Sequence, residues 1–209
     1  MNLLEALFAL LRRLFGKVQS VPPPDAAAEP VTNKLTASQL SLAMGSRIDL
    51  ATKWLPFIVA AMDEFDINTP ARQSMFLSQI GHESGSLRYS AEIWGPSEAQ
   101  KRYEGRVDLG NIETGDGSRF RGRGLLQITG RGNYTETGKA LGVDLLSDPE
   151  LLGLPELAAR SAAWWWMTHG LNGIADTGDN LKATQRINGG TNGLADRMAR
   201  YEVAKRVFA

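Results

Sequence analysis

The stretch "MFLSQIGHESGSLRYSAEIWG", residues 75–95, joins two patterns of side chains end to end. Its first part has apolar and amide side chains at helical spacing, and a Ser-Gly-Ser segment then stops the helix just after Glu83. Its second part, residues 86–94, alternates along the chain as a strand does and carries Glu92. The stretch therefore predicts a helix followed by an extended segment, with one carboxylate on each.

Helical signals dominate the chain after residue 33. Helices are predicted over residues 36–45, 47–67, 69–85, 155–170, 180–190 and 192–209. Thr36 or Ser38 is expected to cap the first of these, and the second forms one helix or two, with Pro56 near a helix start. Strand signals are limited to the segment around Glu92 and to the Gly-rich residues 120–134. We therefore expect a mainly α-helical domain with a small extended element between helical layers.

The N-terminal part differs in character from this domain. Residues 1–18 predict an amphipathic helix, because the leucines and phenylalanines share one arc and the basic side chains lie opposite. The Pro- and Ala-rich residues 19–33 predict a semi-rigid linker, which leaves residues 34–209 as the catalytic domain. The helix either lies on an anionic membrane surface or packs against the domain or a second copy, and the sequence leaves both interpretations open.

Composition excludes several kinds of site and partner. Lys+Arg and Asp+Glu both number 23, so there is no basic surplus for a nucleic-acid partner. The chain has no cysteine for a disulfide or a metal site, and its two histidines do not favour a protein-ligated zinc ion. At the N-terminus the positive charges follow the apolar run instead of preceding it, so no secretion signal is indicated and synthesis in the cytoplasm is expected.

Glu83 and Glu92 are candidates for acid and base catalysis. Glu83 should lie at the negative end of a helix, where ionisation is mildly disfavoured, as suits a proton donor. A separation of roughly 6.5–9.5 Å between two such carboxyls admits a water molecule and gives inversion at a sugar, whereas roughly 5 Å gives retention. The spacing along the chain does not fix this distance, and it leaves Glu104 and Glu113 as rival partners of Glu83.

Polar and aromatic side chains near these glutamates are candidates for ligand binding. The Gly-rich stretch allows close approach to a ligand and offers hydrogen bonds from Gln127, Thr129, Asn133 and Tyr134. It lacks the Lys-Ser/Thr pair of a phosphate loop, and a generic turn is the alternative. Trp94, beside Glu92, is the best candidate for stacking on a sugar. Most of Trp164, Trp165 and Trp166 should be core, and His169 a helix C-terminal residue.

Several motifs taken together resemble the family 19 glycoside hydrolases, which include the plant-type chitinases and many phage endolysins. These motifs are "GHESGS", "FRGRGLLQITGRGNY", "RINGG" and "ADRMARY", and they follow the order of that family from about Ser38 to the C-terminus. The "AARSAAWWW" and "NGGTNGLADR" segments are most similar to lysins of phages, prophages or phage-tail-like bacteriocin clusters.

The resemblance implies a role for each matching residue. Glu83 matches the general acid, Glu92 the general base, and Thr129 the position that helps to hold the attacking water. The matching positions that line or support the substrate cleft are His82, Gln127, Asn133, Asn188 and Arg197. With Trp94 and Tyr134 these form the expected substrate-binding set, and no metal or organic cofactor is implied.

The resemblance also implies a lysozyme-like, two-lobed fold and an inverting endolysin that hydrolyses β-1,4 bonds of peptidoglycan. Peptidoglycan is preferred over chitin because the motifs resemble lysins and the cysteines of the plant enzymes are absent. Without a secretion signal, such an endolysin would reach the periplasm and the cell wall through a holin pore. The alternatives are a lytic transglycosylase, to which "ESGSL" and "GLLQIT" are also similar, a chitinase, or an inactive membrane- or glycan-binding protein. Muramidase and glucosaminidase specificity are both open.

Overall fold

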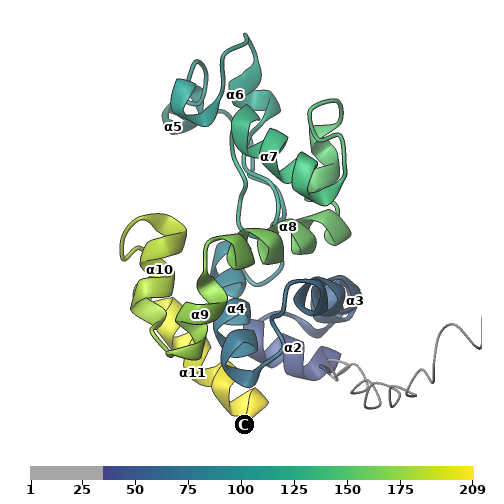
Figure 1. Ribbon diagram of the computed structural model, residues 1–209, viewed down its shortest axis with the longest axis vertical. Helices are drawn as coiled ribbons and strands as arrows, with labels where there is room; N and C mark the ends of the chain where they lie inside the picture. Colours follow the sequence, from purple (N-terminus) through teal and green to yellow (C-terminus); the bar gives the residue numbers. More distant parts are fainter. Residues whose placement is uncertain (1–34) are drawn as a thin grey trace, which may run out of the picture. The chain divides into compact units, whose positions relative to one another are not determined.

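The structure, a computed structural model, describes residues 35–209. The amphipathic helix predicted over residues 1–18 and the linker predicted over residues 19–33 lie outside the described residues, and both stay predictions. The helices in chain order are α2 (Ala37–Met44), α3 (Ile48–Glu64), α4 (Pro70–Glu83), α5 (Glu98–Lys101), α6 (Asp116–Arg119), α7 (Arg131–Leu141), α8 (Pro155–Thr168), α9 (Leu171–Asp176), α10 (Asn180–Asn188) and α11 (Leu194–Phe208), with 3-10 turns η1 (Val107–Leu109) and η2 (Pro149–Gly153) (Figure 1). The predicted mainly α-helical class is confirmed.

All six helices predicted from the sequence are present. Thr36 begins α2 with a capping box, in which its hydroxyl accepts a hydrogen bond from the Gln39 N–H and the Gln39 side chain accepts one from the Thr36 N–H. Residues 47–67 form one helix, α3, and Pro56 lies inside it instead of near its start. Because Pro56 is exposed, water can reach the carbonyl oxygen that loses its helical partner there.

The extended element is smaller than the alternating pattern predicted. Among the described residues, strand pairing consists of two isolated antiparallel bridges, Ala91 with Arg123 and Arg123 with Ile128. The alternation fails at its start because Ser86 and Leu87 adopt left-handed φ values of 64° and 66°. The end of the Gly-rich stretch also differs from the prediction, since the chain becomes helical at Arg131.

Two hydrophobic cores divide the domain into two lobes, as the resemblance implied. The large lobe packs α2, α3, α4, α9 and α11 around a core in which Phe76 meets Trp166 edge-on, with ring centroids 5.3 Å apart. The small lobe lies between α4 and α8 along the chain, and its core contains Phe120, Ile128, Tyr134, Leu145 and Leu152. Figure 1 shows α8 between the two lobes. Trp165 of α8 packs against both cores, so this helix fixes one lobe against the other.

Buried polar side chains hold the small lobe together. Arg123 is fully buried, pairs with Glu150 and donates a 2.8 Å hydrogen bond to the Tyr134 hydroxyl. Asp116 accepts hydrogen bonds from the backbone N–H groups of residues 112 and 113 and a 2.6 Å hydrogen bond from Arg131.

No helix within residues 35–209 has the length and apolar character needed to cross a membrane.

We expect Asp116→Asn to destabilise the small lobe. The hydrogen bond from Arg131 holds the pKa of Asp116 below its usual value. A lowered folded pKa stabilises the fold above the unfolded pKa of about 4, and this stability is lost as pH falls through the folded pKa. The substitution should therefore reduce the free energy of unfolding at pH 7 by about 1.5–3 kcal/mol, measured by thermal unfolding, and weaken the acid dependence.

The control for this experiment is Asp108→Asn. Asp108 also pairs with an arginine, Arg106, but its side chain is 64% exposed. Exposed ion pairs contribute little to stability, so the melting temperature of this variant should stay that of the parent. Equal losses of stability in both variants would show that the pairing of Asp116 with Arg131 contributes no more than an exposed ion pair does.

Candidate active site

Glu83 is the last residue of α4, and a buried guanidinium from α11 holds its side chain. Arg197 is 2% exposed and donates to Glu83 Oε1 through Nη2 and to Gln79 Oε1, at 2.5 Å, through Nη1. Gln79 in turn donates to Thr184 at 3.2 Å, so the hydrogen-bonded chain continues into α10. The sequence placed Glu83 at a helix end correctly and named Arg197 among the positions that line or support the cleft, but it did not pair the two residues.

His82 lies beside Glu83 and is held by the same face of α11. Its Nδ1 is 2.7 Å from Asp196 Oδ2, and Asp196 also accepts a 2.6 Å hydrogen bond from Arg200. Burial acts to raise the pKa of Asp196, but the hydrogen bonds from Arg200 and His82 outweigh it and lower this pKa. The ring of His82 packs so closely on Gly193 that a Cβ there would lie 2.3 Å from two ring atoms.

Asn188 supports the loop between α10 and α11 that contains Gly193. Its Nδ2 donates to the carbonyl of Asn192 at 2.9 Å, and its Oδ1 accepts from the N–H of Gly190 at 2.8 Å. Both polar ends of the Asn188 side chain are thus used within the loop. Asn188 therefore stabilises the loop that packs against His82 through Gly193.

Glu92 is anchored in the small lobe. Its Oε1 accepts from Gln100 at 3.0 Å and its Oε2 accepts from the Gly122 N–H at 3.2 Å, while its own N–H donates to the Gly122 carbonyl at 2.8 Å. Tyr103 donates a longer hydrogen bond of 3.5 Å to Oε1. Burial, followed by the charge of Glu92, raises the pKa of Tyr103. Sequence analysis missed Gln100 and Tyr103, which lie in a segment with no family motif.

Gly122 is the point at which three predicted side chains converge. A Cβ on Gly122 would lie 2.7 Å from Gln127 Oε1, 3.2 Å from Thr129 Oγ1 and 3.4 Å from Glu92 Oε2. Only glycine leaves room for these oxygens to approach the backbone so closely. Gln127 itself has a left-handed φ of 53°, a strained conformation for a residue with a side chain.

Asn133 completes this cluster from the first turn of α7. Its side-chain amide donates a 2.7 Å hydrogen bond to the carbonyl of Thr129. Thr129 in turn donates its hydroxyl hydrogen to the carbonyl of Gln127 at 2.9 Å. The four predicted residues Glu92, Gln127, Thr129 and Asn133 therefore occupy one connected site.

The two rival carboxylates have other partners. Both oxygens of Glu104 accept hydrogen bonds from backbone N–H groups, at 2.6 Å from Gly115 and 2.9 Å from Gly117. Glu113 pairs with Arg131 at 2.6 Å, and its side chain is 66% exposed. Glu92, in contrast, lies beside Thr129 and Gln127 at Gly122. The pairing of Glu92 with Glu83 stays a prediction.

Two residues of the expected substrate-binding set are buried, which corrects the interpretation of Tyr134 and agrees with the supporting position that the resemblance allowed for Arg197. Tyr134 is fully buried, and its hydroxyl donates to the carbonyl of Arg121 at 2.7 Å. Burial raises the pKa of Tyr134 to about 12, so the phenol stays neutral. Arg197 is buried beneath Glu83. These two side chains support the site from within instead of contacting a ligand, because their polar atoms are already bound inside the protein.

The tryptophans divide between core and surface. Trp166 is fully buried, whereas Trp164 and Trp165 are half-buried and pack against the core, so one of the three consecutive tryptophans is fully core where most were expected to be. Trp94 is also half-buried, and its ring lies 6.2 Å from that of Tyr103 at an angle of 37°. The position of Trp94 beside Glu92 agrees with a stacking surface, which stays a prediction.

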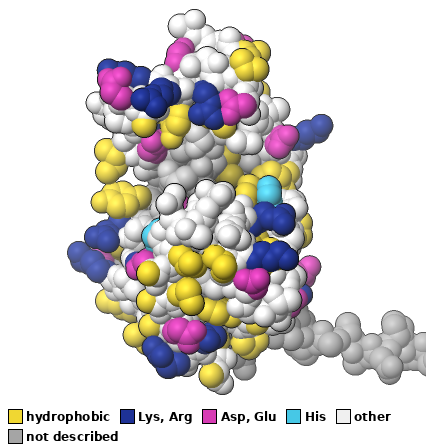
Figure 2. Space-filling model, turned by 90° about the vertical axis from the view of Figure 1, so that its left-hand side faces the viewer, with side chains coloured by type: hydrophobic (Ala, Val, Ile, Leu, Met, Phe, Trp, Pro, Cys, Tyr) yellow, Lys and Arg dark blue, Asp and Glu magenta, His cyan; other side chains and the backbone are white. Residues whose placement is uncertain are grey.

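A cavity of about 240 Å³ lies next to this cluster, between α7 and α8. Gln127, Thr129 and Asn133 line it on the small-lobe side, and Trp165 and His169 line it on the α8 side. Figure 2 shows that this face of the molecule is hollowed between the lobes. The residues lining the cavity do not include Glu83 or Glu92, and Thr129 is the lining residue that also lies beside Gly122, near Glu92. Among residues 35–209, no group of three His or acidic side chains is placed to hold a metal ion.

A helical domain of two lobes, with one carboxylate held in each, defines the class of lysozyme-like glycoside hydrolases. Residues 63–203, more than half of the chain, match the sequence profile described as chitinase class I. The chain belongs to glycoside hydrolase family 19, and it is a glycoside hydrolase of the chitinase-like type.

Its relatives are bacterial and plant proteins. It is 36% identical over 158 residues to a glycosyl hydrolase family 19 domain-containing protein of Haemophilus influenzae, covering 62% of this chain and 76% of that one. It is 34% identical over 137 residues to an endochitinase of Arabidopsis thaliana, covering 63% of this chain and 45% of the plant protein.

Solved structures show the same fold. A bacterial family 19 chitinase superposes with a TM-score of 0.67 at 23% identity, over 86% of this chain and 95% of that one. Chitinase C of Streptomyces griseus gives a TM-score of 0.66 at 21% identity, over 88% and 79% of the two chains. The lysozyme-like architecture implied by the sequence is thereby confirmed.

We expect Gly193→Ala to impair catalysis by displacing His82. The added methyl group would overlap the imidazole ring, and a displacement of about 1 Å near a reacting group can reduce a rate by about 10²-fold. The measurement is the initial rate of glycan hydrolysis, together with the melting temperature.

Gly189→Ala is the matched control within the same loop. Gly189 has a similar left-handed φ of 74°, but its Cβ would meet nothing within 4 Å. Both variants should lose about 1–2 kcal/mol of stability from the left-handed backbone, and only Gly193→Ala should lose activity. An equal loss of activity in Gly189→Ala would assign the effect to the loop and not to His82.

Proposed function

We propose that this glycoside hydrolase is an endolysin that hydrolyses β-1,4 bonds of bacterial peptidoglycan by single displacement. The observation that carries the proposed mechanism is the convergence of Glu92, Thr129 and Gln127 on Gly122, in the lobe opposite Glu83. In this proposal Glu83 protonates the glycosidic oxygen, and Glu92 removes a proton from the attacking water.

The contacts of Glu83 hold its carboxyl in one orientation. Arg197 fixes the orientation of the carboxyl, because the guanidinium is itself buried and bound to Gln79. Once Glu83 has donated its proton, the positive charge of Arg197 compensates the new negative charge in a partly buried place. The guanidinium therefore stabilises the state that follows proton transfer.

The contacts of Thr129 and Glu92 suit the binding of water. The Thr129 hydroxyl already donates its hydrogen to the carbonyl of Gln127, so toward a water molecule it can act only as an acceptor. Glu92 is a second acceptor, held in place by Gln100 and the Gly122 N–H. Two acceptors on one water direct both of its hydrogens toward the protein and its lone pairs away, toward a sugar carbon.

Peptidoglycan is proposed as the substrate because the motifs resemble those of phage lysins and the chain has no cysteine. Chitin is the second candidate, since relatives of the chain include proteins named endochitinases. A lytic transglycosylase would use one acid and no water, and the two acceptors proposed to bind water, on Glu92 and Thr129, are the reason to prefer a hydrolase.

Replacement of either carboxylate should abolish turnover of purified peptidoglycan sacculi. Glu83→Gln keeps an oxygen that can accept from Arg197, so the fold should survive while the rate falls by about 10²–10⁴-fold. Glu92→Gln should lower kcat to a similar extent with little change in affinity for glycan. For the parent enzyme, mass spectrometry of the fragments released from sacculi should show new reducing ends.

Glu113→Gln is the control, because it removes a carboxylate that is exposed and paired only with Arg131. Its rate should equal that of the parent. A rate above about a tenth of the parent in Glu83→Gln would remove Glu83 from the mechanism. Anhydro-sugar products would identify a transglycosylase, and turnover of chitin oligomers but not of sacculi would identify a chitinase.

We further propose that residues 1–18 contact anionic membranes while the enzyme works on the wall. The support is the sequence pattern of an apolar arc opposed by Arg12, Arg13 and Lys17. The proposed place of action is the periplasm and the cell wall, reached from the cytoplasm through a holin or a similar pore. Docking of the same helix on the domain or on a second copy is the alternative.

Deletion of residues 1–33 should leave hydrolysis of purified sacculi unchanged and reduce co-sedimentation with anionic vesicles. The described domain contains both of its cores without these residues, so it should fold alone. Charge reversal of Arg12 and Arg13 to Glu in the full chain should reproduce the loss of vesicle binding. A fall of several degrees in melting temperature after deletion would show that the leucines cover protein and not lipid.

A further inference from the structure

Gln100, in the short helix α5, has every hydrogen-bonding group of its side chain in use. Its Oε1 accepts from the backbone N–H of Ser97 at 2.8 Å and from that of Gly95 at 3.4 Å. Its Nε2 donates to Glu92 Oε1 at 3.0 Å and to the carbonyl of Ile93 at 2.8 Å. The residue is 7% exposed. Because the two groups beside Oε1 are both N–H donors, the amide fits in one orientation, and its own N–H groups face Glu92.

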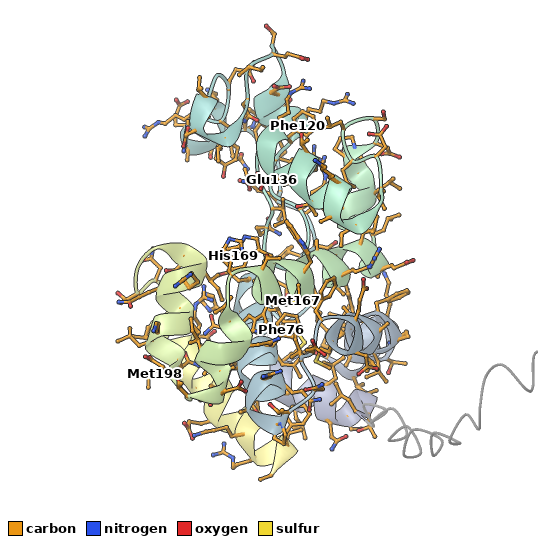
Figure 3. The ribbon with its side chains drawn as sticks, in the orientation of Figure 1. Phe76, Phe120, Glu136, Met167, His169 and Met198 are labelled. Carbon is orange, nitrogen blue, oxygen red and sulfur yellow. The ribbon has the colours of Figure 1, made fainter. Side chains whose placement is uncertain are left out.

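The two oxygens of Glu92 have different surroundings within the small lobe, whose core residue Phe120 is labelled in Figure 3. Oε1 accepts the hydrogen bond from Gln100. Oε2 accepts from the Gly122 N–H, and it is the oxygen that approaches the same side of Gly122 as Thr129 Oγ1. Oε1 is therefore occupied by a side-chain donor, whereas Oε2 lies beside the hydroxyl that is proposed to hold the water.

The side chains that bind Glu92 carry no positive charge. Among residues 35–209, no Lys, Arg or His forms an ion pair with it. Arg121 and Arg123, which flank Gly122 in the chain, both pair with Glu150 instead. A cation at hydrogen-bonding distance would make the carboxylate a weaker base, because it favours the charged form. A neutral amide has no net charge, so it holds the carboxylate with a smaller loss of basicity.

The titratable group that faces Glu92 is the phenol of Tyr103, whose hydroxyl lies 3.5 Å from Oε1. Burial, followed by the charge of Glu92, raises the pKa of Tyr103, so the phenol is neutral near pH 7. Other charged side chains of this segment bind elsewhere: Glu98 to Lys101, Glu104 to the N–H groups of Gly115 and Gly117, and Arg106 to Asp108. The ionisation of Glu92 is therefore exposed to whatever group occupies position 100.

We propose that Gln100 is a positioning residue of the reaction, which binds Glu92 Oε1 through a neutral donor and so presents Oε2 to the attacking water. Gln100 acts through Glu92 and touches neither water nor sugar. The inference rests on the proposed role of Glu92 as the general base. A capping box makes the arrangement rigid, because Ser97 Oγ accepts from the Gln100 N–H at 3.3 Å while Gln100 Oε1 accepts from the Ser97 N–H.

Gln100→Glu tests the proposal, because it keeps the cap of α5 and removes the donor to Glu92. Glutamate serves as well as glutamine at this position of a capping box, so one of its oxygens can still accept from the Ser97 N–H. The other oxygen would replace the amide nitrogen that lies 3.0 Å from Glu92 Oε1. Two carboxylates so close do not both ionise near neutral pH, and they share a proton until the pH rises.

The measurement is the pH–rate profile of the full-length protein on the glycan that the parent hydrolyses, sacculi or chitin oligomers. A general base works only when it is ionised, so the acid limb of the profile should move to higher pH by about one unit or more in Gln100→Glu. On that limb the rate should fall about tenfold, and it should recover as the pH rises. A merely structural role would lower the rate equally at every pH.

Gln39→Glu is the matched control. Gln39 closes the capping box of α2 with Thr36 in the same way, and its side chain contacts no carboxylate. Its melting temperature and its pH–rate profile should match those of the parent. An equal movement of the profile in Gln39→Glu would assign the effect to the added charge in general and would overturn the proposal.

A second measurement follows Glu92 without turnover. Carbon-13 NMR of the glutamate carboxyl groups is titrated with pH, and the Glu92 signal is identified by its absence in Glu92→Gln. Its midpoint should move to higher pH in Gln100→Glu, and an unmoved midpoint in a variant that keeps the melting temperature of the parent shows that the proposal is wrong. A midpoint that moves while the pH–rate profile does not would show that Gln100 controls Glu92 but that Glu92 is not the general base, so the proposed function would be the part that fails.

Discussion

The ion pair between Glu83 and Arg197 is the interaction around which the site is built. A buried guanidinium is tolerated only when its donors are bound, and here Glu83, Gln79 and the carbonyl of Asn192 bind them. This requirement fixes α11 against α4, which pack together extensively, and it fixes the loop that precedes α11. The carboxylate proposed as the general acid is therefore oriented by the same contacts that hold the large lobe together.

Neighbouring residues of α11 extend this clamp over the end of α4. Asp196 binds His82, and Arg200 reaches the hydroxyl of Ser86 at 3.0 Å, within the left-handed turn after Glu83. A turn with two non-glycine residues at positive φ is strained. The strained conformation persists because hydrogen bonds on both sides of the turn hold it in place. The turn then directs the chain toward Glu92. The hydrogen bonds that hold the strained backbone of the turn therefore also help to place the side chain of Glu92.

The small lobe holds the acceptors that are proposed to bind the attacking water. Its few apolar residues give a small core, and buried Arg123 and Asp116 supply the cohesion that the core lacks. Gly122 brings Glu92, Thr129 and Gln127 together by leaving out a side chain. A cavity of about 240 Å³ adjoins this cluster and is lined by Gln127, Thr129 and Asn133.

The sequence by itself determined the helices with strong periodicity and caps, such as α2 and α4, because these depend on residues three and four positions apart. It also identified the connected site of Gln127, Thr129 and Asn133, because these residues share one motif. It did not reveal α7, whose glycines conceal its helical period, nor the left-handed turn at Ser86, which distant Arg200 helps to hold. Only the tertiary structure paired Glu83 with Arg197, gave Glu104 and Glu113 other partners, and buried Tyr134. Those outcomes depend on contacts between residues far apart in the chain, and local spacing carries no information about them.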